Sequence, residues 1–183
     1  NKKTLKKKDN LRFEDYTAPS YSEIKSEIDK KVGLRPALPT DLPKGEWTEQ
    51  ALKVLKERYL VKDSNLNPIE TPDDVMWRVA WEVASSEARW GASKKDVMKS
   101  AREFYELMVS RKFLPNSPTL MNAGTGNGLQ YSACFVLPVE DSMEGIFDAL
   151  KYQAIIHKTG GGTGFSFTRL RPSGSLVKTS SGT

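Results

Sequence analysis

Apolar residues recur at helical spacing through the middle third of the chain. The segment TEQALKVLKERYL, which starts at Thr48, places apolar side chains along one side of a helix: Ala51, Leu52, Val54, Leu55 and Leu60. A second helix is predicted in PDDVMWRVAWEVASSEARWG, because Thr71 is a typical N-cap before Pro72 and Gly91 is a typical stop. A third follows the N-cap Ser93, with apolar positions at Val97, Ala101, Phe104, Tyr105 and Met108.

These three segments predict a helical domain over residues 47–113. We expect it to bury its aromatic stripe, with these tryptophans as packing anchors: Trp77, Trp81 and Trp90. Residues 1–46 differ, since they are polar, rich in lysine and interrupted by prolines. Only SEIKSEIDKK offers a short helix there, so we predict an extended basic N-terminal arm.

The pattern changes again over residues 114–183. LPNSPTLMNAGTGNG is rich in turn residues and is predicted to be a loop. YSACFVLPV reads as a buried strand, EDSMEGIFDALKYQAIIHK as a helix and FSFTRLRP as a second strand after a glycine-rich turn. Strand, helix and strand form a βαβ unit, so the predicted fold class is α/β, with this last region the start of a sheet or barrel.

Length and composition favour one ordinary domain. The 183 residues are 38% hydrophobic, and no apolar run is long enough to cross a membrane. No secretory signal is evident, because the N-terminal lysines lack an apolar run behind them, and a reducing cytoplasm fits best. The net charge of +5 lies largely in NKKTLKKKDNLR, which reads as a solvated tail rather than a nucleic-acid-binding arm.

Cys134 is the single cysteine of the chain, and His157 is the single histidine. An internal disulfide is therefore excluded, and these two side chains are too few for a self-contained zinc site, so no metal is expected. His157 is at the end of a predicted helix and receives no catalytic role. From its neighbours alone, Cys134 is either an inert packing residue or a reactive thiol.

Three features near the C-terminus leave a structural and a functional alternative open. The turn TGGG, from Thr159 to Gly162, matches neither the P-loop nor the GxGxxG pattern, so it is a tight turn or a ligand-cradling loop. Asp141 could cap the next helix, with Glu144 completing a capping box, or it could bind a ligand together with Ser142. The arginines two apart on the second predicted strand could bind phosphate or pair with acids: Arg169 and Arg171.

Three stretches, NSPTLMNAGT, SACFVLPVEDSMEGI and KTGGGTGFSFTRLRPSGS, resemble in order and spacing the start of the catalytic subunit of ribonucleotide reductases. The resemblance covers roughly residues 47–183. ALKVLKERYLVKD and ETPDDVMWRVAWEVA are most similar to the adenosylcobalamin-dependent, class II branch, although class I use of a separate radical-generating subunit stays open. The fold implied is a ten-stranded α/β barrel, of which this chain holds only the first strands.

The resemblance implies roles for particular residues. Cys134 would be one half of the dithiol that reduces the ribose, with the other cysteine supplied from elsewhere. Ser117 matches a hydroxyl residue near the substrate, and Gly162 a glycine whose backbone approaches it. Ala133 stands where some relatives have serine, so a substrate contact is lost there. The effector-binding residues, which would meet a deoxynucleoside triphosphate or ATP, are Asp141, Ser142 and Arg171.

The implied function is ribonucleotide reduction by a radical mechanism, on a di- or triphosphate. Adenosylcobalamin would be bound mainly by parts that this sequence lacks. The implied partners are a second polypeptide or segment completing the barrel, a thioredoxin-like reductant, and further subunits of a homodimer or hetero-oligomer. The alternative is a non-catalytic, deoxynucleotide-binding regulatory or assembly module.

Overall fold

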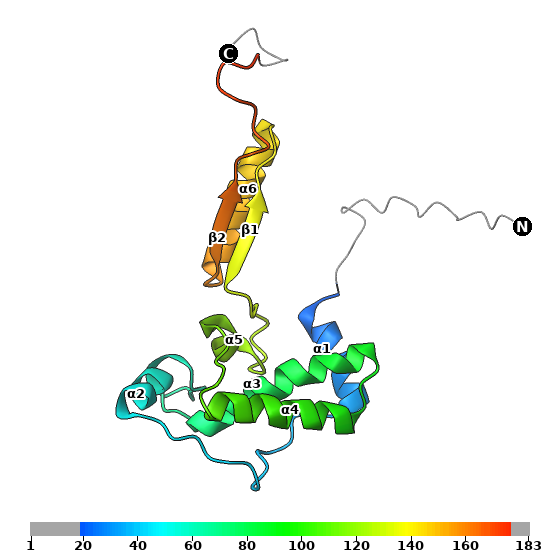
Figure 1. The fold of residues 1–183 in the computed structure, drawn as a ribbon, viewed down its shortest axis with the longest axis vertical. Helices are drawn as coiled ribbons and strands as arrows, with labels where there is room; N and C mark the ends of the chain where they lie inside the picture. The colour runs from blue at the N-terminus through cyan, green and yellow to red at the C-terminus, as the bar shows by residue number, and fades with distance from the viewer. Residues whose placement is uncertain (1–18, 177–183) are drawn as a thin grey trace, which may run out of the picture.

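The structure is a computed structural model that describes residues 19–176. The predicted basic tail, residues 1–12, and the final KTSSGT lie outside the described residues. Nine elements follow one another within these described residues: α1 (Tyr21–Val32), α2 (Glu49–Arg58), α3 (Pro72–Ser85), the 3-10 turn η2 (Ser86–Trp90), α4 (Lys94–Val109), α5 (Ser117–Asn122), β1 (Cys134–Pro138), α6 (Met143–Lys158) and β2 (Gly162–Ser166). Figure 1 shows the helices α1 to α5 as a base from which β1, α6 and β2 project.

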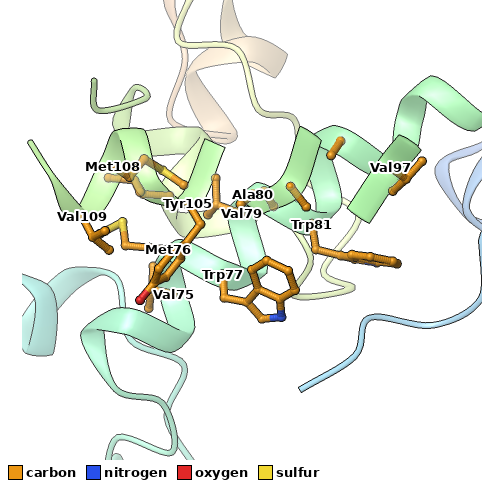
Figure 2. Packing of buried hydrophobic residues seen from close by; sticks show 14 of the residues in the cluster. Val75, Met76, Trp77, Val79, Ala80, Trp81, Val97, Tyr105, Met108 and Val109 are labelled. Atoms are coloured by element: carbon orange, nitrogen blue, oxygen red, sulfur yellow. The ribbon is translucent and has the colours of Figure 1, made fainter. Parts of the chain in front are cut away.

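The core of the base lies between α3 and α4, as the helical periodicity predicted (Figure 2). Trp77 contacts Trp81 in a tilted arrangement and Tyr105 edge-on, with both pairs of ring centroids 6.2 Å apart. Two of these rings bond to backbone carbonyls of the preceding segment: the indole N–H of Trp77 donates to Pro36 and the hydroxyl of Tyr105 to Pro43, each at 2.9 Å. The indole N–H of Trp81, in contrast, is buried without a hydrogen-bond partner among the described residues.

The helix boundaries follow the capping residues. Thr71 and Ser93 each form a capping box, with Asp74 and Asp96 respectively, which satisfies backbone N–H groups that a helix start leaves free. Gly91 adopts a left-handed conformation, with φ of 96°, directly after η2. The predicted N-caps and the predicted stop are therefore confirmed, although α3 itself ends at Ser85 and the chain continues as 3-10 turn.

Trp90 corrects one prediction, because its side chain is 79% exposed and packs in no core. It ends η2, nine residues after Trp81, which is about two and a half turns of an α-helix, so it falls off the buried stripe of α3. The Arg89 guanidinium lies near its ring. The predicted apolar stripe of α2 is also only partly buried: Leu55 is buried, whereas Leu52 and Val54 are exposed.

The short helix predicted in the first region is confirmed as α1. It packs against η2 and α4, and it buries Ile28 and Val32, so this part of the region is docked on the core rather than extended. The limits that the sequence suggests for the three regions, residues 1–46, 47–113 and 114–183, stay predictions.

The helix α5 lies within the segment predicted to be a loop, which corrects that prediction. Asn116 caps it by accepting a hydrogen bond from the N–H of Thr119, and Pro118 stands in its first turn, where the missing N–H costs nothing. The same turn-forming residues that suggested a loop therefore start a short helix.

The predicted βαβ unit is confirmed. β1 and β2 are parallel and adjacent, with Cys134 opposite Gly162 and Pro138 opposite Ser166, and α6 connects them. The prediction of a buried strand is wrong: β1 alternates exposed and half-buried residues, and Val136 is 79% exposed. Among the described residues only β2 lies beside β1 and only α6 packs against the pair, so one face stays open.

The second strand is shorter than predicted. β2 ends at Ser166, and a turn closed by the N–H of Leu170 donating to the carbonyl of Phe167 follows it. Arg169 and Arg171 therefore lie beyond the strand instead of sharing one of its faces. Within residues 19–176, no helix combines the length and the apolar character needed to span a bilayer.

Candidate functional site

The predicted substrate-side residues meet where the two strands begin. Cys134 is the first residue of β1, its thiol is free and its side chain is exposed. Gly162, the first residue of β2, lies directly opposite Cys134 in the register. The N–H of Gly162 donates to the carbonyl of Ala133 at 2.7 Å. The structure thus brings Ala133, Cys134 and Gly162 together at one end of the strand pair.

The glycine-rich turn permits this close approach. A Cβ at Gly161 would lie 2.7 Å from Ile156 and 3.1 Å from the ring of Phe135, so a side chain there would clash. Gly160 has φ of 85°, a conformation that is unfavourable for residues with a side chain. At Gly162 a Cβ would meet nothing nearer than the Ala133 carbonyl at 3.6 Å, so the space beside Cys134 is open. The turn therefore has a structural role at Gly160 and Gly161 and leaves room for a ligand at Gly162.

Ser117 lies apart from this group, at the start of α5. Its hydroxyl shares a 2.8 Å hydrogen bond with the hydroxyl of Tyr59. The link between α5 and β1 runs through two other residues: Thr119 donates to the carbonyl of Tyr131 at 2.9 Å, and Asn122 donates to the carbonyl of Gln130 at 2.8 Å. The structure thus connects α5 to the segment leading to Cys134, but it places no contact between Ser117 and the thiol.

Arg78 holds α5 to the base. Its side chain is 1% exposed, and its Nε donates to Glu70 at 2.8 Å. The two other guanidinium nitrogens donate to backbone carbonyls, which belong to Ala123, Leu120 and Tyr59. A buried guanidinium that satisfies both a carboxylate and the open C-terminal carbonyls of a short helix fixes the position of that helix.

The predicted effector residues lie at the opposite end of the βαβ unit. Ser142 is the N-cap of α6, and its hydroxyl accepts from the N–H of Gly145 at 3.0 Å. Asp141 accepts from Nε of Arg171 at 2.9 and 3.0 Å. Of the alternatives left open for Asp141, the capping box with Glu144 does not form, because Ser142 is the N-cap and Asp141 bonds to the arginine. The strands separate this group from Cys134 by roughly 13 Å, at about 3.3 Å a residue.

Both arginines of this end pair with acids. Arg169 bonds to Glu140 and Arg171 to Asp141, so the salt-bridge alternative describes the arrangement in this structure. All four side chains are more than a third exposed. Pairs in such a setting contribute only about 0–1 kcal/mol, because water screens them. A polyanionic ligand would therefore displace these carboxylates at small cost.

Several connections had no local sequence signal. The carboxylate of Glu82, in α3, accepts from Tyr131, which lies 49 positions further along the chain. His157 shares a 2.9 Å hydrogen bond with Thr163, which ties the end of α6 to β2. Within the described part of the chain, no group of three or more histidine, cysteine, aspartate or glutamate side chains could hold a metal ion.

Comparisons with known proteins agree with the order of these elements. The family model described as "Ribonucleotide reductase, all-alpha domain" matches residues 46–128, and "Ribonucleotide reductase, barrel domain" matches residues 132–183. The break between the two matches falls in the segment that joins α5 to β1.

Individual relatives cover most of this chain. A protein of Thermoplasma acidophilum named vitamin B12-dependent ribonucleoside-diphosphate reductase is 38% identical, over 74% of this chain and 24% of its own length. A protein of the same name from Mycobacterium tuberculosis is 44% identical, over 73% of this chain and 19% of its own. The ribonucleoside-diphosphate reductase subunit alpha of Helicobacter pylori is 38% identical, over 69% and 15%.

The chain spans about a quarter or less of the length of these curated relatives. Helices α2 to α5 lie within the match to the all-alpha domain and the parallel strand pair lies within the match to the barrel domain, in the same order along the chain. The chain belongs to the ribonucleotide reductase large-subunit family.

Proposed function

We propose that this chain supplies one of the two reducing thiols of a ribonucleotide reductase that converts ribonucleotides to deoxyribonucleotides by a radical mechanism. The observation that carries the proposal is the place of Cys134: it is exposed, unpaired and the first residue of the first barrel strand, beside a glycine that leaves its surroundings open. An inert packing cysteine would instead be buried.

The chemistry needs a second thiol. Reduction breaks the bond between the 2′-carbon of the ribose and its hydroxyl oxygen and replaces it with a bond to hydrogen. The hydroxyl leaves as water, and two thiols become one disulfide, which accounts for the two electrons and two hydrogens consumed. Cys134 is the one cysteine of this sequence, so the second thiol comes from further polypeptide.

The substrate would lie across the start of the strand pair. Opposite the thiol, Gly162 has no side chain, so the substrate can approach its backbone. Ala133 has no hydroxyl, so other groups must position the substrate. Ser117 is the substrate-side hydroxyl of α5, and its bond to Tyr59 fixes its orientation. The proposed substrate is a ribonucleoside di- or triphosphate.

The cofactor of the proposed enzyme is adenosylcobalamin, as the names of the B12-dependent relatives suggest. The described residues do not themselves fit it. Their apolar recess, lined by α3, α4 and the start of α5, measures about 460 Å³ and is smaller than a corrin with its nucleotide loop and adenosyl ligand needs. The cofactor would therefore be bound mainly outside the described residues.

The proposed partners follow from the open surfaces. β1 and α6 expose large apolar side chains, among them Val136 at 79% and Met143 at 65%. Further barrel strands, in a second chain or segment, and a second subunit would cover such surfaces. A thioredoxin-like dithiol protein would reduce the disulfide after each turnover, which requires a reducing compartment such as the cytoplasm.

The test is reduction of a ribonucleoside diphosphate by the reductase that contains this chain. We expect deoxynucleotide formation in the presence of adenosylcobalamin and a dithiol, and none when the cofactor is left out. Equal turnover without adenosylcobalamin would contradict the proposed cofactor, and no turnover under any condition would contradict the proposed reaction.

A second candidate function, deoxynucleotide binding, is favoured by the Asp141–Arg171 pair beside the N-terminus of α6. There Arg171 would exchange its weak bond to the carboxylate for bonds to the effector's phosphates, while Asp141 and Ser142 would meet the sugar hydroxyl and the polar groups of the base. This site alone would serve a non-catalytic regulatory module.

Asp141→Asn is expected to weaken the binding of a deoxynucleoside triphosphate by about tenfold or more, because it removes a charged hydrogen-bond acceptor worth about 1.5–3 kcal/mol. Titration calorimetry on the full chain measures the effect. Glu140→Gln is the matched control, since Glu140 pairs with Arg169 alone and should leave affinity within about twofold. Equal loss in both variants would contradict the assignment of Asp141.

A further inference from the structure

The carboxylate of Glu82 is nearly enclosed inside the base, although it belongs to no site described above. The residue is 8% exposed. Its Oε1 accepts from the hydroxyl of Tyr131 at 2.9 Å and from that of Tyr21 at 3.0 Å, and its Oε2 pairs with Lys25 at 3.1 Å. We call these four residues, Glu82, Tyr21, Lys25 and Tyr131, the Glu82 cluster.

The cluster compensates the cost of burying a charge. An enclosed carboxylate is costly unless a cation and hydrogen-bond donors meet it, and here one ammonium group and two hydroxyls do so. Burial raises the pKa of the Tyr131 hydroxyl, as do its bond to Tyr21 and the negative charge of Glu82. Burial alone would lower the pKa of Lys25, but its bonds to Asp29 and Glu82 outweigh this, and the pKa is raised. Both donors therefore keep their protons at neutral pH.

The cluster joins three separate parts of the chain. Tyr21 and Lys25 come from α1, Glu82 from α3, and Tyr131 from the segment that enters β1. Only residues 132 and 133 separate Tyr131 from Cys134, a distance along the chain of at most about 10 Å. The ring of Tyr131 also packs against the core of the base. The bond from Tyr131 to Glu82 is thus a side-chain connection from the interior of the base to the segment carrying the thiol.

We propose that Glu82 and Tyr131 are positioning residues for Cys134: the enclosed carboxylate fixes the Tyr131 hydroxyl and thereby sets where the first barrel strand, with its thiol, stands on the helical base. This inference rests on the proposed function of Cys134. The side chains of Thr119 and Asn122 bond to backbone carbonyls of the same segment. The Tyr131 hydroxyl is the third attachment of this segment, and it determines the direction in which the segment enters β1.

The chain offers a matched pair of variants. Tyr131→Phe and Tyr21→Phe each remove one hydroxyl from the same oxygen of Glu82, at nearly equal lengths, and each keeps the ring. The two differ in location, because Tyr21 lies on α1 and Tyr131 lies before β1. If the two hydroxyls only stabilised the Glu82 cluster, the two variants would have equal effects on hydrogen exchange near Cys134 and on turnover. If Tyr131 positions Cys134, its variant has the larger effect on both.

The first measurement is amide hydrogen exchange in the full chain, at Cys134, Phe135 and Gly162. Losing one hydrogen bond worth about 0.5–1.5 kcal/mol corresponds to an increase in exchange rate of roughly twofold to tenfold. We expect that increase at the start of β1 in Tyr131→Phe and less than twofold in Tyr21→Phe. Equal increases in the two variants, or none in either, would overturn the proposal.

The second measurement is steady-state kinetics of the reductase that contains the chain. Misplacing a reacting thiol lowers kcat while leaving substrate binding intact, so Tyr131→Phe should lower kcat at least about fivefold with KM unchanged. Tyr21→Phe should change neither value. Faster exchange in Tyr131→Phe with an unchanged kcat would overturn the positioning role, provided that Cys134→Ser is inactive in the same assay. If Cys134→Ser were itself fully active, the proposed function of the thiol would fail instead.

Discussion

Replacing Cys134 by serine is expected to abolish multiple turnover of the reductase that contains this chain. A hydroxyl cannot form a disulfide, so the two electrons that the ribose consumes would have no source at this position. Deoxynucleotide formation should fall to the background measured without enzyme, in an assay with substrate, adenosylcobalamin and a dithiol in excess.

Two controls separate this loss from unfolding. Cys134 is exposed and free, so its replacement should change the free energy of unfolding by no more than about 0.5 kcal/mol. Ser132→Ala alters an exposed position two residues earlier and should retain turnover. Full activity of Cys134→Ser would contradict the proposed role of the thiol, whatever the behaviour of Ser132→Ala.

Arg78→Met is expected to cause the largest loss of stability. Removing one partner of a buried ion pair typically costs about 3–5 kcal/mol, since the other charge stays enclosed without compensation. Here the stranded charge is Glu70, which is 11% exposed, and the carbonyls of Ala123 and Leu120 lose their donor as well. Urea unfolding of the full chain measures the change in free energy.

Arg102→Met is the matched control for this prediction. Arg102 also pairs with a carboxylate, that of Asp41, but the two side chains are 31% and 67% exposed. Such a pair contributes about 0–1 kcal/mol, so its loss should be small. If the two arginine variants lowered the free energy of unfolding by similar amounts, burial would not determine the strength of these ion pairs.

Local sequence signals predicted the helical base well. Thr71 and Ser93 are followed three residues later by acids, and this spacing forms a capping box whatever the surroundings. The apolar spacing of α4 placed Val97, Ala101 and Tyr105 in the core, where they are 0% exposed. Each of these features depends on residues within a few positions of one another, which is why the sequence alone determines them.

Features that depend on distant residues escaped prediction. For Asp141 the sequence left open a capping box with Glu144 or ligand binding, but its carboxylate bonds to Arg171, 30 positions away. Trp90 lies nine residues after Trp81, about two and a half turns of an α-helix, so it does not continue the stripe of Trp77 and Trp81, and it is exposed. The apolar run of β1 is typical of a buried strand with neighbours on both sides. The described residues supply one neighbouring strand, so β1 is not buried.

Of the candidate site, the resemblance supplied the residues and the structure supplied their arrangement. Cys134 and Gly162 are 28 positions apart in sequence, and the parallel register places them opposite each other. The connection from Glu82 to Tyr131 could not be read from the sequence, because a glutamate on an amphipathic helix ordinarily faces water.

The most direct test is the oxidation state of Cys134 after one turnover. The reductase is mixed with substrate and cofactor without any dithiol, quenched with an alkylating reagent, digested and examined by mass spectrometry. The proposed role of Cys134 predicts that the peptide carrying it is joined by a disulfide to a second cysteine, in an amount equal to the deoxynucleotide formed. Stoichiometric deoxynucleotide together with a fully alkylated, reduced Cys134 would contradict it.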